Sequence, residues 1–402
     1  MMAKPPTLLS LFAQLVASAT IATSCPVAAQ DAGPEALTPG VLPPHRDAHP
    51  GVQGTVPVDL YVSPAGSDSN PGSRSLPFQT IGRAARAVLA GATVYVAPGV
   101  YTENISTEAH GSKHARIRYV SKTKWGAKVI GSGTEAAWTN RGDYTEISGF
   151  DIRGSGRLGI LNRGSHTRIA GNHVHDLAVS GGCTSEGGAG IMNGNYRATD
   201  GDIVGNVVHD IGVRGACNAV QGIYHANLRG RIYNNIVYRA SAFGIHLWHA
   251  ANKVVVANNT TFANGSGVMG GGIVIGAGDK PGGVVLDHTK VVNNIVYDNP
   301  HASILEFCYP GQNCTGSNNT IENNLVYRNG GKLTLRAAKA RNTISADPQF
   351  IDYQPDGTGN YRLRRTSPAV NKGAPGGAPR VDIDNRRRPR GAAHDIGAYE
   401  NY

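Results

Sequence analysis

Tyr224 and His246 are the two residues whose type and position best suit acid–base chemistry. Each follows a Gly-Ile pair, in the segments QGIY and FGIH, so the two occupy equivalent places in successive strand-like segments. If the isoleucines point into a core, alternation along each strand sends Tyr224 and His246 outward as neighbours. A neutral imidazole or phenol can take or give the proton at C5 of a uronic acid. The pair would therefore suit a metal-independent elimination or epimerisation of a uronate.

Further residues near this pair are candidates for substrate binding. Trp248 lies two positions beyond His246 on the same expected face, where its ring could stack on a sugar. His249 and Lys253 follow in the next turn, and Lys253 would neutralise a carboxylate. Glu186 lies upstream in the glycine-rich loop GGCTSEGGAG. The alternative is that outward aromatic and histidine side chains merely cover the sheet.

The next aligned position adjoins this candidate cleft and is more polar. It holds Asn162, Asn193, His225, Leu247, Ile275 and Glu306. We expect its asparagines and His225 to extend a polar ladder near a bend. The place of His225 beside the cleft also makes it a candidate substrate contact.

Two His-Asp pairs, His175-Asp176 and His209-Asp210, stand at equivalent places in consecutive repeats. A repeated pair indicates repeated packing, and these pairs could bind a metal across two coils only if both histidines turn outward. We therefore predict no metal site. The paired carboxylates that glycoside hydrolysis requires are not evident either, because acidic residues do not align on neighbouring coils.

The elements that must position these residues are short repeated strands. One phrase, a β-branched residue followed by an asparagine and further apolar residues, recurs from residue 169 to 326 at intervals of about 24 to 35 residues, a period typical of a solenoid. Its asparagines are Asn172, Asn206, Asn235, Asn259, Asn294 and Asn324. We expect each to adopt a left-handed backbone at a bend and to bond to its neighbours in a ladder.

A second strand per repeat contains the Gly-Ile pair or a near equivalent. These strands are LGIL (158–161), AGIM (189–192), QGIY (221–224), FGIH (243–246), GGIV (271–274) and ASIL (302–305). The chain has 53 glycines in 402 residues and only 6% aromatic residues, which suits tight corners around a narrow core. At least two strands per turn predict an all-β fold, a single-stranded parallel β-helix.

The first 29 residues resemble an export signal, with Lys4 before an apolar stretch and cleavage expected near Ala29. Lipoprotein processing at Cys25 is the less favoured alternative. No other apolar run is long enough to span a bilayer. We therefore expect a secreted or periplasmic protein, with a disordered spacer at 30–57.

Removal of the signal leaves four cysteines, an even number for an oxidising compartment. Cys308 and Cys314 bracket a short loop and are expected to close it. Cys183 and Cys217 lie at similar distances before equivalent strands and are expected to face each other on adjacent coils. A zinc site is the rival interpretation, but the chain has no CxxC pair.

The formal net charge of +10 invites a polyanion as partner, but its distribution weakens that inference. Residues 169–330 are close to neutral, and the basic excess lies in 60–168 and 331–402. The chain also lacks a nucleic-acid-binding motif with interleaved aromatic residues. We expect a polysaccharide partner rather than a nucleic acid, and a monomer.

The segment before the repeats, LYVSPAGSDSNPGSRSLPFQTIGRAARAVLAGATVYVAPGVYTE (60–103), resembles the opening of secreted pectate-lyase-like β-helix proteins. Thr80 is expected to cap a helix from Ile81 to about Leu89 that covers the first coil. DPQF, YRLRRTSPAVNKG and HDIGAYE (347–400) are similar to the closing segment of such proteins. The resemblance implies a right-handed β-helix divided into a cap and first coils (58–135), repeats (136–330) and a closing segment (331–402).

Sequences of this kind are grouped near polysaccharide lyase family nine, whose calcium-dependent members cleave acidic pectins with a lysine base. The resemblance thus implies a lyase acting by β-elimination, with calcium as its cofactor. The aspartate cluster that would hold calcium is not found, and no lysine matches the family base, so we predict no cofactor from the residues themselves. The alternatives are a non-catalytic glycan-binding or cell-surface β-helix, or a glycoside hydrolase or epimerase on the same scaffold.

Overall fold

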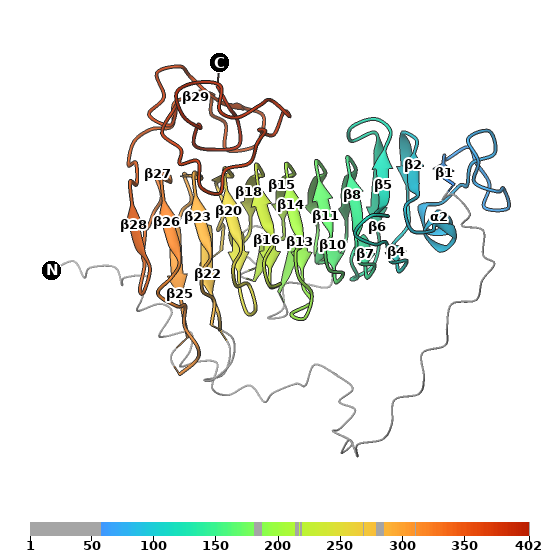
Figure 1. Ribbon diagram of the computed structural model, residues 1–402, viewed down its shortest axis with the longest axis horizontal. Coiled ribbons are helices and arrows are strands. Elements are labelled where there is room, and N and C mark those ends of the chain that lie inside the picture. The colour runs from blue at the N-terminus through green and yellow to red at the C-terminus, as the bar shows by residue number, and fades with distance from the viewer. Residues whose placement is uncertain are drawn as a thin grey trace, which may run out of the picture. The chain divides into compact units, whose positions relative to one another are not determined.

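The computed structural model describes residues 58–180, 187–213, 217, 219–267, 269–278, 285–309 and 311–401 (Figure 1). The predicted signal and spacer (1–57), Cys25, Cys183 and Glu186 lie outside the described residues. No helix in the described part of the chain is long and apolar enough to cross a membrane.

Three long parallel sheets run the length of the β-helix, and each coil contributes a strand to each sheet in turn. Sheet A consists of β1 (Leu60–Val62), β2 (Thr93–Val96), β5 (Ile117–Ser121), β8 (Thr145–Ser148), β11 (Arg168–Ala170), β14 (Asp202–Val204), β17 (Arg231–Tyr233), β20 (Val255–Ala257), β23 (Lys290–Val292), β26 (Thr320–Glu322) and β28 (Lys339–Arg341). Sheet B consists of β3 (Gly99–Tyr101), β6 (Ala127–Gly131), β9 (Asp151–Gly154), β12 (His173–Leu177), β15 (Val207–Ile211), β18 (Ile236–Ala240), β21 (Thr260–Phe262), β24 (Ile295–Tyr297) and β27 (Leu325–Tyr327). Sheet C consists of β4 (Ile105–Thr107), β7 (Trp138–Asn140), β10 (Leu158–Asn162), β13 (Gly188–Asn193), β16 (Val220–His225), β19 (Phe243–Leu247), β22 (Gly271–Gly276) and β25 (Ala302–Phe307).

The repeated asparagine phrase is two strands rather than one. Its first residues belong to sheet A and its last to sheet B, and the asparagine lies at the bend between them, as Asn172 does between β11 and β12. Each coil therefore has three strands. The strand before the bend and the strand after it both point branched side chains into the same interior. Ile169 on β11 and Val174 on β12 are at most 1% exposed there.

The predicted asparagine ladder is confirmed. The side-chain amide of Asn235 donates to Oδ1 of Asn259 at 2.9 Å, and that of Asn259 donates to Oδ1 of Asn294 at the same distance. The contact from Asn172 to Asn206 has the same form, and all three central asparagines are fully buried. The ladder satisfies backbone groups as well, because Oδ1 of Asn259 also accepts from the backbone N–H of Asn235.

The left-handed backbone, however, belongs to the residue before each ladder asparagine, so that part of the expectation is wrong. These positions, with φ between 51° and 65°, are Gly171, Gly205, Asn234, Asn258, Asn293 and Asn323. Glycine and asparagine are the residues that adopt this conformation at least cost. The first residue of each Gly-Asn or Asn-Asn pair makes the bend, and the second forms the ladder.

The closing segment packs on the later coils of sheet B (Figure 1). It contains the antiparallel pair β29 (Phe350–Asp352) and β30 (Asn360–Leu363). Phe350 and Tyr361 pack against Phe262 and Tyr297, which point outward from β21 and β24. The segment thus covers outward aromatic side chains that sheet B would otherwise expose.

The first coil is capped as predicted. Helix α2 (Ile81–Ala87) begins after Thr80, whose hydroxyl accepts from the backbone N–H of Arg83 at 3.1 Å. Ile81 and Ala84 are buried against the first coils. The Cys308–Cys314 disulfide is present, and Cys217 is also disulfide-bonded.

Replacing Asn259 by alanine is expected to destabilise the protein by roughly 3–5 kcal/mol. The change leaves the side-chain and backbone donors of Asn235 and the carbonyl of Ile232 buried without their partner. Urea unfolding followed by circular dichroism measures the loss. The matched control is Asn104→Ala, which removes exposed contacts to Ser132 and should cost under about 1 kcal/mol; equal costs for the two variants would contradict the ladder's role.

Candidate functional site

The strands of sheet C bring Tyr224 and His246 together as predicted. Tyr224 on β16 is the direct partner of His246 on β19, and their ring centroids are 5.1 Å apart with the rings nearly perpendicular. The isoleucines before them, Ile223 and Ile245, are fully buried, so alternation turns Tyr224 and His246 to the outer face. The same register aligns the whole predicted row from Leu161 to Leu305.

His246 lies among aromatic rings and has no polar partner within the described residues. Phe243 and Trp248 contact its ring, with centroids 5.5 and 5.1 Å away, and neither ring nitrogen forms a hydrogen bond. Burial, with a smaller contribution from His249, lowers the pKa of His246 to about 3. The imidazole is therefore neutral in any ordinary medium, with one nitrogen lone pair unused.

Trp248 and His249 were expected to contact the substrate, but both pack against other side chains. Trp248 is 8% exposed, and its ring lies against Gly276, Gly278 and Phe307, so it has no open face for a sugar. Its role is to support the wall around His246. His249 contacts the exposed ring of Tyr196, at 4.5 Å between centroids.

His225 is an interior residue, which corrects its candidacy as a substrate contact. The ring is fully buried and continues the expected polar row, with Nδ1 3.0 Å from the side-chain nitrogen of Asn193. Its Nε2 lies 2.8 Å from the carbonyl oxygen of Arg229 and 3.1 Å from that of Asn227. Burial lowers the pKa of His225 to about 4, so it is a neutral link between coils.

Sheet C does not offer the ligands of a calcium ion. Glu306 is the only acidic residue on its strands, which also contain no lysine or arginine. That carboxylate is 1% exposed and accepts from the hydroxyl of Thr315 and from the backbone N–H groups of Arg336 and Ala338. Calcium needs several oxygen ligands, so the described strands around His246 do not fit it.

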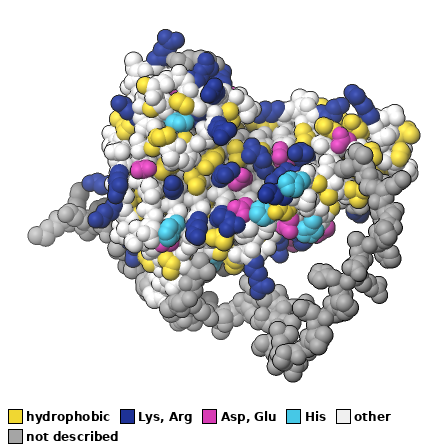
Figure 2. Space-filling model, viewed as in Figure 1, with side chains coloured by type: hydrophobic (Ala, Val, Ile, Leu, Met, Phe, Trp, Pro, Cys, Tyr) yellow, Lys and Arg dark blue, Asp and Glu magenta, His cyan; other side chains and the backbone are white. Residues whose placement is uncertain are grey.

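Lys253 lines a cavity that does not include Tyr224 or His246. The cavity, of about 460 Å³, lies at the edge of sheet A and is bounded by His166, Asp200, Asp202, Arg229, Gly230, Arg231, Lys253 and Val255. Figure 2 shows histidine, acidic and basic side chains side by side near the middle of the face that it draws. Arg229 and Asp200 are already paired at 2.7 Å, so the charges at this edge largely neutralise one another.

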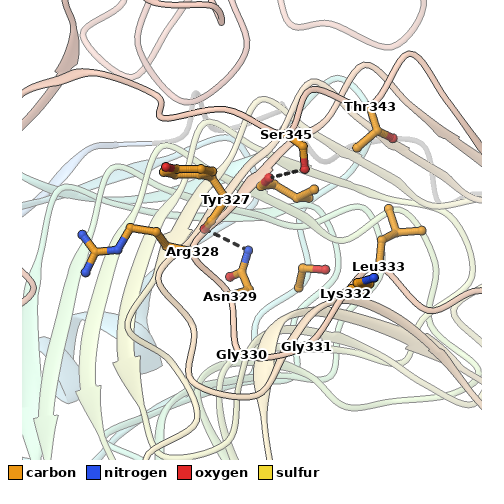
Figure 3. A pocket seen from close by; sticks show the side chains of 11 residues that line it. Tyr327, Arg328, Asn329, Gly330, Gly331, Lys332, Leu333, Thr343 and Ser345 are labelled. Atoms are coloured by element: carbon orange, nitrogen blue, oxygen red, sulfur yellow. Dashed lines mark hydrogen bonds between the residues drawn. The ribbon is translucent and has the colours of Figure 1, made fainter.

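A larger cavity of about 500 Å³ lies at the end of the stack, beside Tyr327 and Lys332 (Figure 3). Two of its polar groups are bonded within the fold: Asn329 donates to the carbonyl of Tyr327, and the hydroxyl of Ser345 donates to that of Val326. Arg328 points away from the cavity toward Tyr297 and Asp298. This cavity has the volume of a binding site, and its lining includes the Tyr327 phenol and the Lys332 amine.

Sequence reasoning missed a histidine cluster on sheet B. The rings of His173, His175 and His209 gather on β12 and β15, next to Asp151 on β9. Both histidines of the His-Asp pairs turn outward, whereas their neighbours Val174 and Val208 are fully buried. The HVHD segment signals alternate outward histidines, but Asp151 is too distant in the sequence to be joined to them without the register of the coils.

Comparison with known proteins agrees with this architecture. The model of the Pel9A-like, right handed beta helix region matches residues 60–343. The uncharacterized protein YwoF of Bacillus subtilis (strain 168) is 26% identical over 360 residues, which cover 71% of this chain and 73% of YwoF. Pectate lyase L of Dickeya dadantii (strain 3937) is 25% identical over 292 residues, 67% of this chain and 65% of that protein.

Among solved structures, the crystal structure of pectate lyase Pel9A superimposes with a TM-score of 0.59 at 18% identity, covering 87% of this chain and 97% of Pel9A. That likeness shows the fold, a right-handed parallel β-helix. The family match spans most of the described coils, from β1 to the strand β28 that ends sheet A. The chain belongs to the Pel9A-like right-handed β-helix family.

Proposed function

We propose that this protein is an exported, monomeric polysaccharide lyase that cleaves a uronate-containing polysaccharide by β-elimination. The single observation that carries the proposal is His246, a neutral imidazole without a polar partner among the described residues, beside Tyr224 on the outer face of sheet C. Membership of a β-helix family with relatives named as pectate lyases supports the choice of reaction. Fold alone would not, since one fold hosts many activities.

The reaction needs a base and an acid, and the pair supplies both. A lone pair of His246 takes the proton from C5 of a uronate; the C5–H electrons form the C4=C5 bond as the C4–O4 bond breaks. The leaving oxygen takes a proton from the Tyr224 hydroxyl, which solvent restores. Phe243 and Trp248 form an apolar wall that keeps the imidazole neutral. Both ring nitrogens of His246 are buried, so the substrate has to displace part of this wall to reach the base.

The test is a panel of uronate polymers, namely polygalacturonate, rhamnogalacturonan, alginate and glucuronan, incubated with the purified chain with EDTA or with calcium. A lyase produces unsaturated ends, which are followed by their ultraviolet absorbance. We expect product on at least one polymer with EDTA present, because sheet C offers no calcium ligands in its described strands. Absence of product on every polymer in both conditions would refute the proposal.

A glycan-binding β-helix without catalysis is the second candidate. It is favoured by the near absence of charged side chains from the strands of sheet C, which leaves no strand cation to neutralise a uronate carboxylate. Affinity electrophoresis on the same polymers separates the two functions. Retardation without unsaturated ends would identify a binding protein.

A further inference from the structure

Three histidines on sheet B are each held by a separate carboxylate. Nδ1 of His173 lies 3.0 Å from Oδ2 of Asp151. Nδ1 of His175 lies 2.8 Å from Oδ2 of Asp176, and Nδ1 of His209 lies 2.7 Å from Oδ2 of Asp210. An ionised carboxylate only accepts hydrogen bonds, so each contact places a proton on Nδ1.

The Nε2 atoms of His173 and His209 consequently face each other with their lone pairs. Nε2 of His173 and Nε2 of His209 are 2.7 Å apart, and one candidate ligand atom from each of the three histidines lies within 4.8 Å of the others. Two nitrogen lone pairs at that separation repel each other unless a proton or a cation lies between them. Nε2 of His175 faces Oδ2 of Asp151 at 3.1 Å, a contact with the same requirement.

We propose that His173, His175 and His209 bind a divalent transition metal, best matched by Zn²⁺, through their three Nε2 atoms. Three neutral imidazoles, each with a carboxylate on the opposite nitrogen, form the ligand arrangement that orients histidines on zinc. The fourth position is left to water or a small anion. The side chains are between 12% and 21% exposed, which admits an ion.

The surroundings hold this cluster rigidly. Trp125 packs on His173 with centroids 4.7 Å apart, and its indole N–H donates to the carbonyl of Gly171. On the other side, the ring of Tyr238 lies parallel to His209 at 4.5 Å. Arg239 pairs with Asp210 at 2.7 Å and fixes the carboxylate that orients His209. Pre-organised ligands of this kind lose little entropy on binding.

The site joins three successive coils. They directly precede the coils that the closing segment covers. Asp151, His175 and His209 come from β9, β12 and β15, while Tyr238 on the next coil already contacts Gly357 of the closing segment. A metal here would cross-link the coils of sheet B that the segment leaves uncovered. It lies on sheet B, whereas the proposed catalytic pair lies on sheet C, so its presence does not depend on the lyase activity.

The test is a zinc titration of the full chain without a histidine tag, after treatment with EDTA and dialysis. Isothermal calorimetry should show a single Zn²⁺ per chain, and Zn²⁺ should raise the melting temperature. Co²⁺ should give the intense visible absorption of a tetrahedral site. His209→Gln should weaken Zn²⁺ binding roughly 100-fold or more, and Asp210→Asn, which keeps all three ligands, about 10- to 100-fold.

The matched control is His288→Gln. His288 is also next to an aspartate, with Nδ1 3.3 Å from Oδ2 of Asp287, but it is not part of the cluster and is 60% exposed. Its replacement should leave the affinity and the Co²⁺ spectrum unchanged. Equal Zn²⁺ affinity in wild type, His209→Gln and Asp210→Asn, or no binding by the wild type, would overturn the proposal. Circular dichroism of the metal-free variants excludes a folding defect, and if His209→Gln does not fold, Asp210→Asn decides.

Discussion

His246→Ala is expected to lower the kcat of elimination by roughly 10²- to 10⁴-fold, the usual contribution of a general base. The imidazole is the only nitrogen base on the outer face of the described strands of sheet C, since His225 is buried and bonded within the coil. Tyr224→Phe, which removes the proposed acid and keeps the ring, should lower kcat by a similar factor. Initial rates on the polymer identified by the panel measure both effects.

The pH dependence tests the same assignment independently. Because burial lowers the pKa of His246 to about 3, the base stays unprotonated as the pH falls through the range in which an exposed histidine gains a proton. The acid limb of the kcat/KM profile should therefore show no break near pH 6.5 that is due to this residue. A break there that disappears in His246→Ala would contradict the buried, neutral state.

Two substitutions serve as controls for these activity losses. His288→Ala removes an exposed imidazole and Arg387→Ala an exposed guanidinium, both away from the strands of sheet C. Each should keep its activity within about twofold, since surface substitutions rarely disturb a fold. If His246→Ala and Tyr224→Phe retained the same rates as these controls, the catalytic assignment would be wrong.

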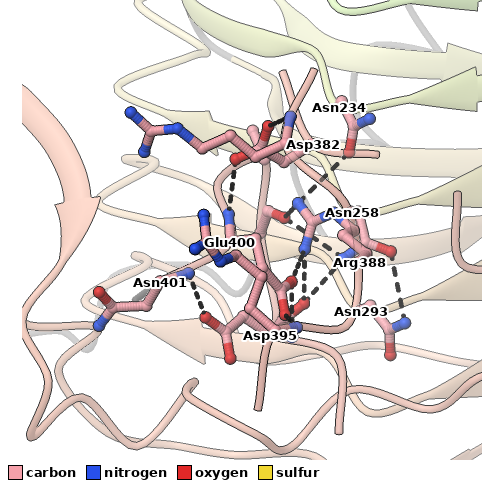
Figure 4. Close-up of polar contacts among 12 residues, drawn as sticks. Asn234, Asn258, Asn293, Asp382, Arg388, Asp395, Glu400 and Asn401 are labelled. Atoms are coloured by element: carbon pink, nitrogen blue, oxygen red, sulfur yellow. Dashed lines mark hydrogen bonds and ion pairs between the residues drawn. The ribbon is translucent and has the colours of Figure 1, made fainter. Parts of the chain in front are cut away.

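Arg388→Met is expected to destabilise the closing segment by about 3–5 kcal/mol, the usual cost of breaking a buried ion pair. The side chains of Arg388 and Glu400 are 0% and 1% exposed, and Nη1 lies 2.6 Å from Oε2 (Figure 4). Arg388 also donates to the carbonyls of Asp395 and Gly397. Removal of the guanidinium leaves the Glu400 carboxylate buried without its positive partner.

Urea unfolding and limited proteolysis of the closing segment measure this effect. The neighbouring Arg387 is exposed, so Arg387→Met should change stability by less than about 0.5 kcal/mol. Combining Arg388→Met with Glu400→Leu should recover part of the loss, because no unpaired charge then remains buried. If Arg388→Met were as stable as Arg387→Met, the Arg388–Glu400 pair would not be what holds the closing segment in place.

Asparagines at the bends between sheets A and B also attach the closing segment to the coils. The side chain of Asn258 donates to the carbonyl of Asp395, that of Asn234 to Val381, and that of Asn293 to Ala374 (Figure 4 shows the three asparagines). Earlier coils, which the closing segment does not cover, have Gly171 and Gly205 at the same left-handed position. The change from Gly-Asn to Asn-Asn along the repeats therefore marks where the segment docks.

The repeated phrase was enough to predict the coils, the ladder and the pairing of Tyr224 with His246. Each of these features depends on the same residue recurring in the same place on adjacent coils, so a period in the sequence becomes a contact in space. In the Gly-Asn pairs the glycine adopts the left-handed conformation; in the Asn-Asn pairs the left-handed role was assigned to the wrong asparagine, because both have the same propensity. Only their directions, one into the coil and one toward the closing segment, distinguish them.

The sequence by itself determined the stack and its register, whereas the tertiary structure decided what covers the stack and what gathers on its outer faces. The contact of Asn258 with Asp395 spans 137 residues and has no period. Asp151 is the strand partner of His173, yet its carboxylate also contacts His175 further along β12, which the register alone does not specify. Stacking is local and repetitive, so the pattern of residues encodes it; docking and clustering depend on where single side chains point, and only the folded chain specifies that.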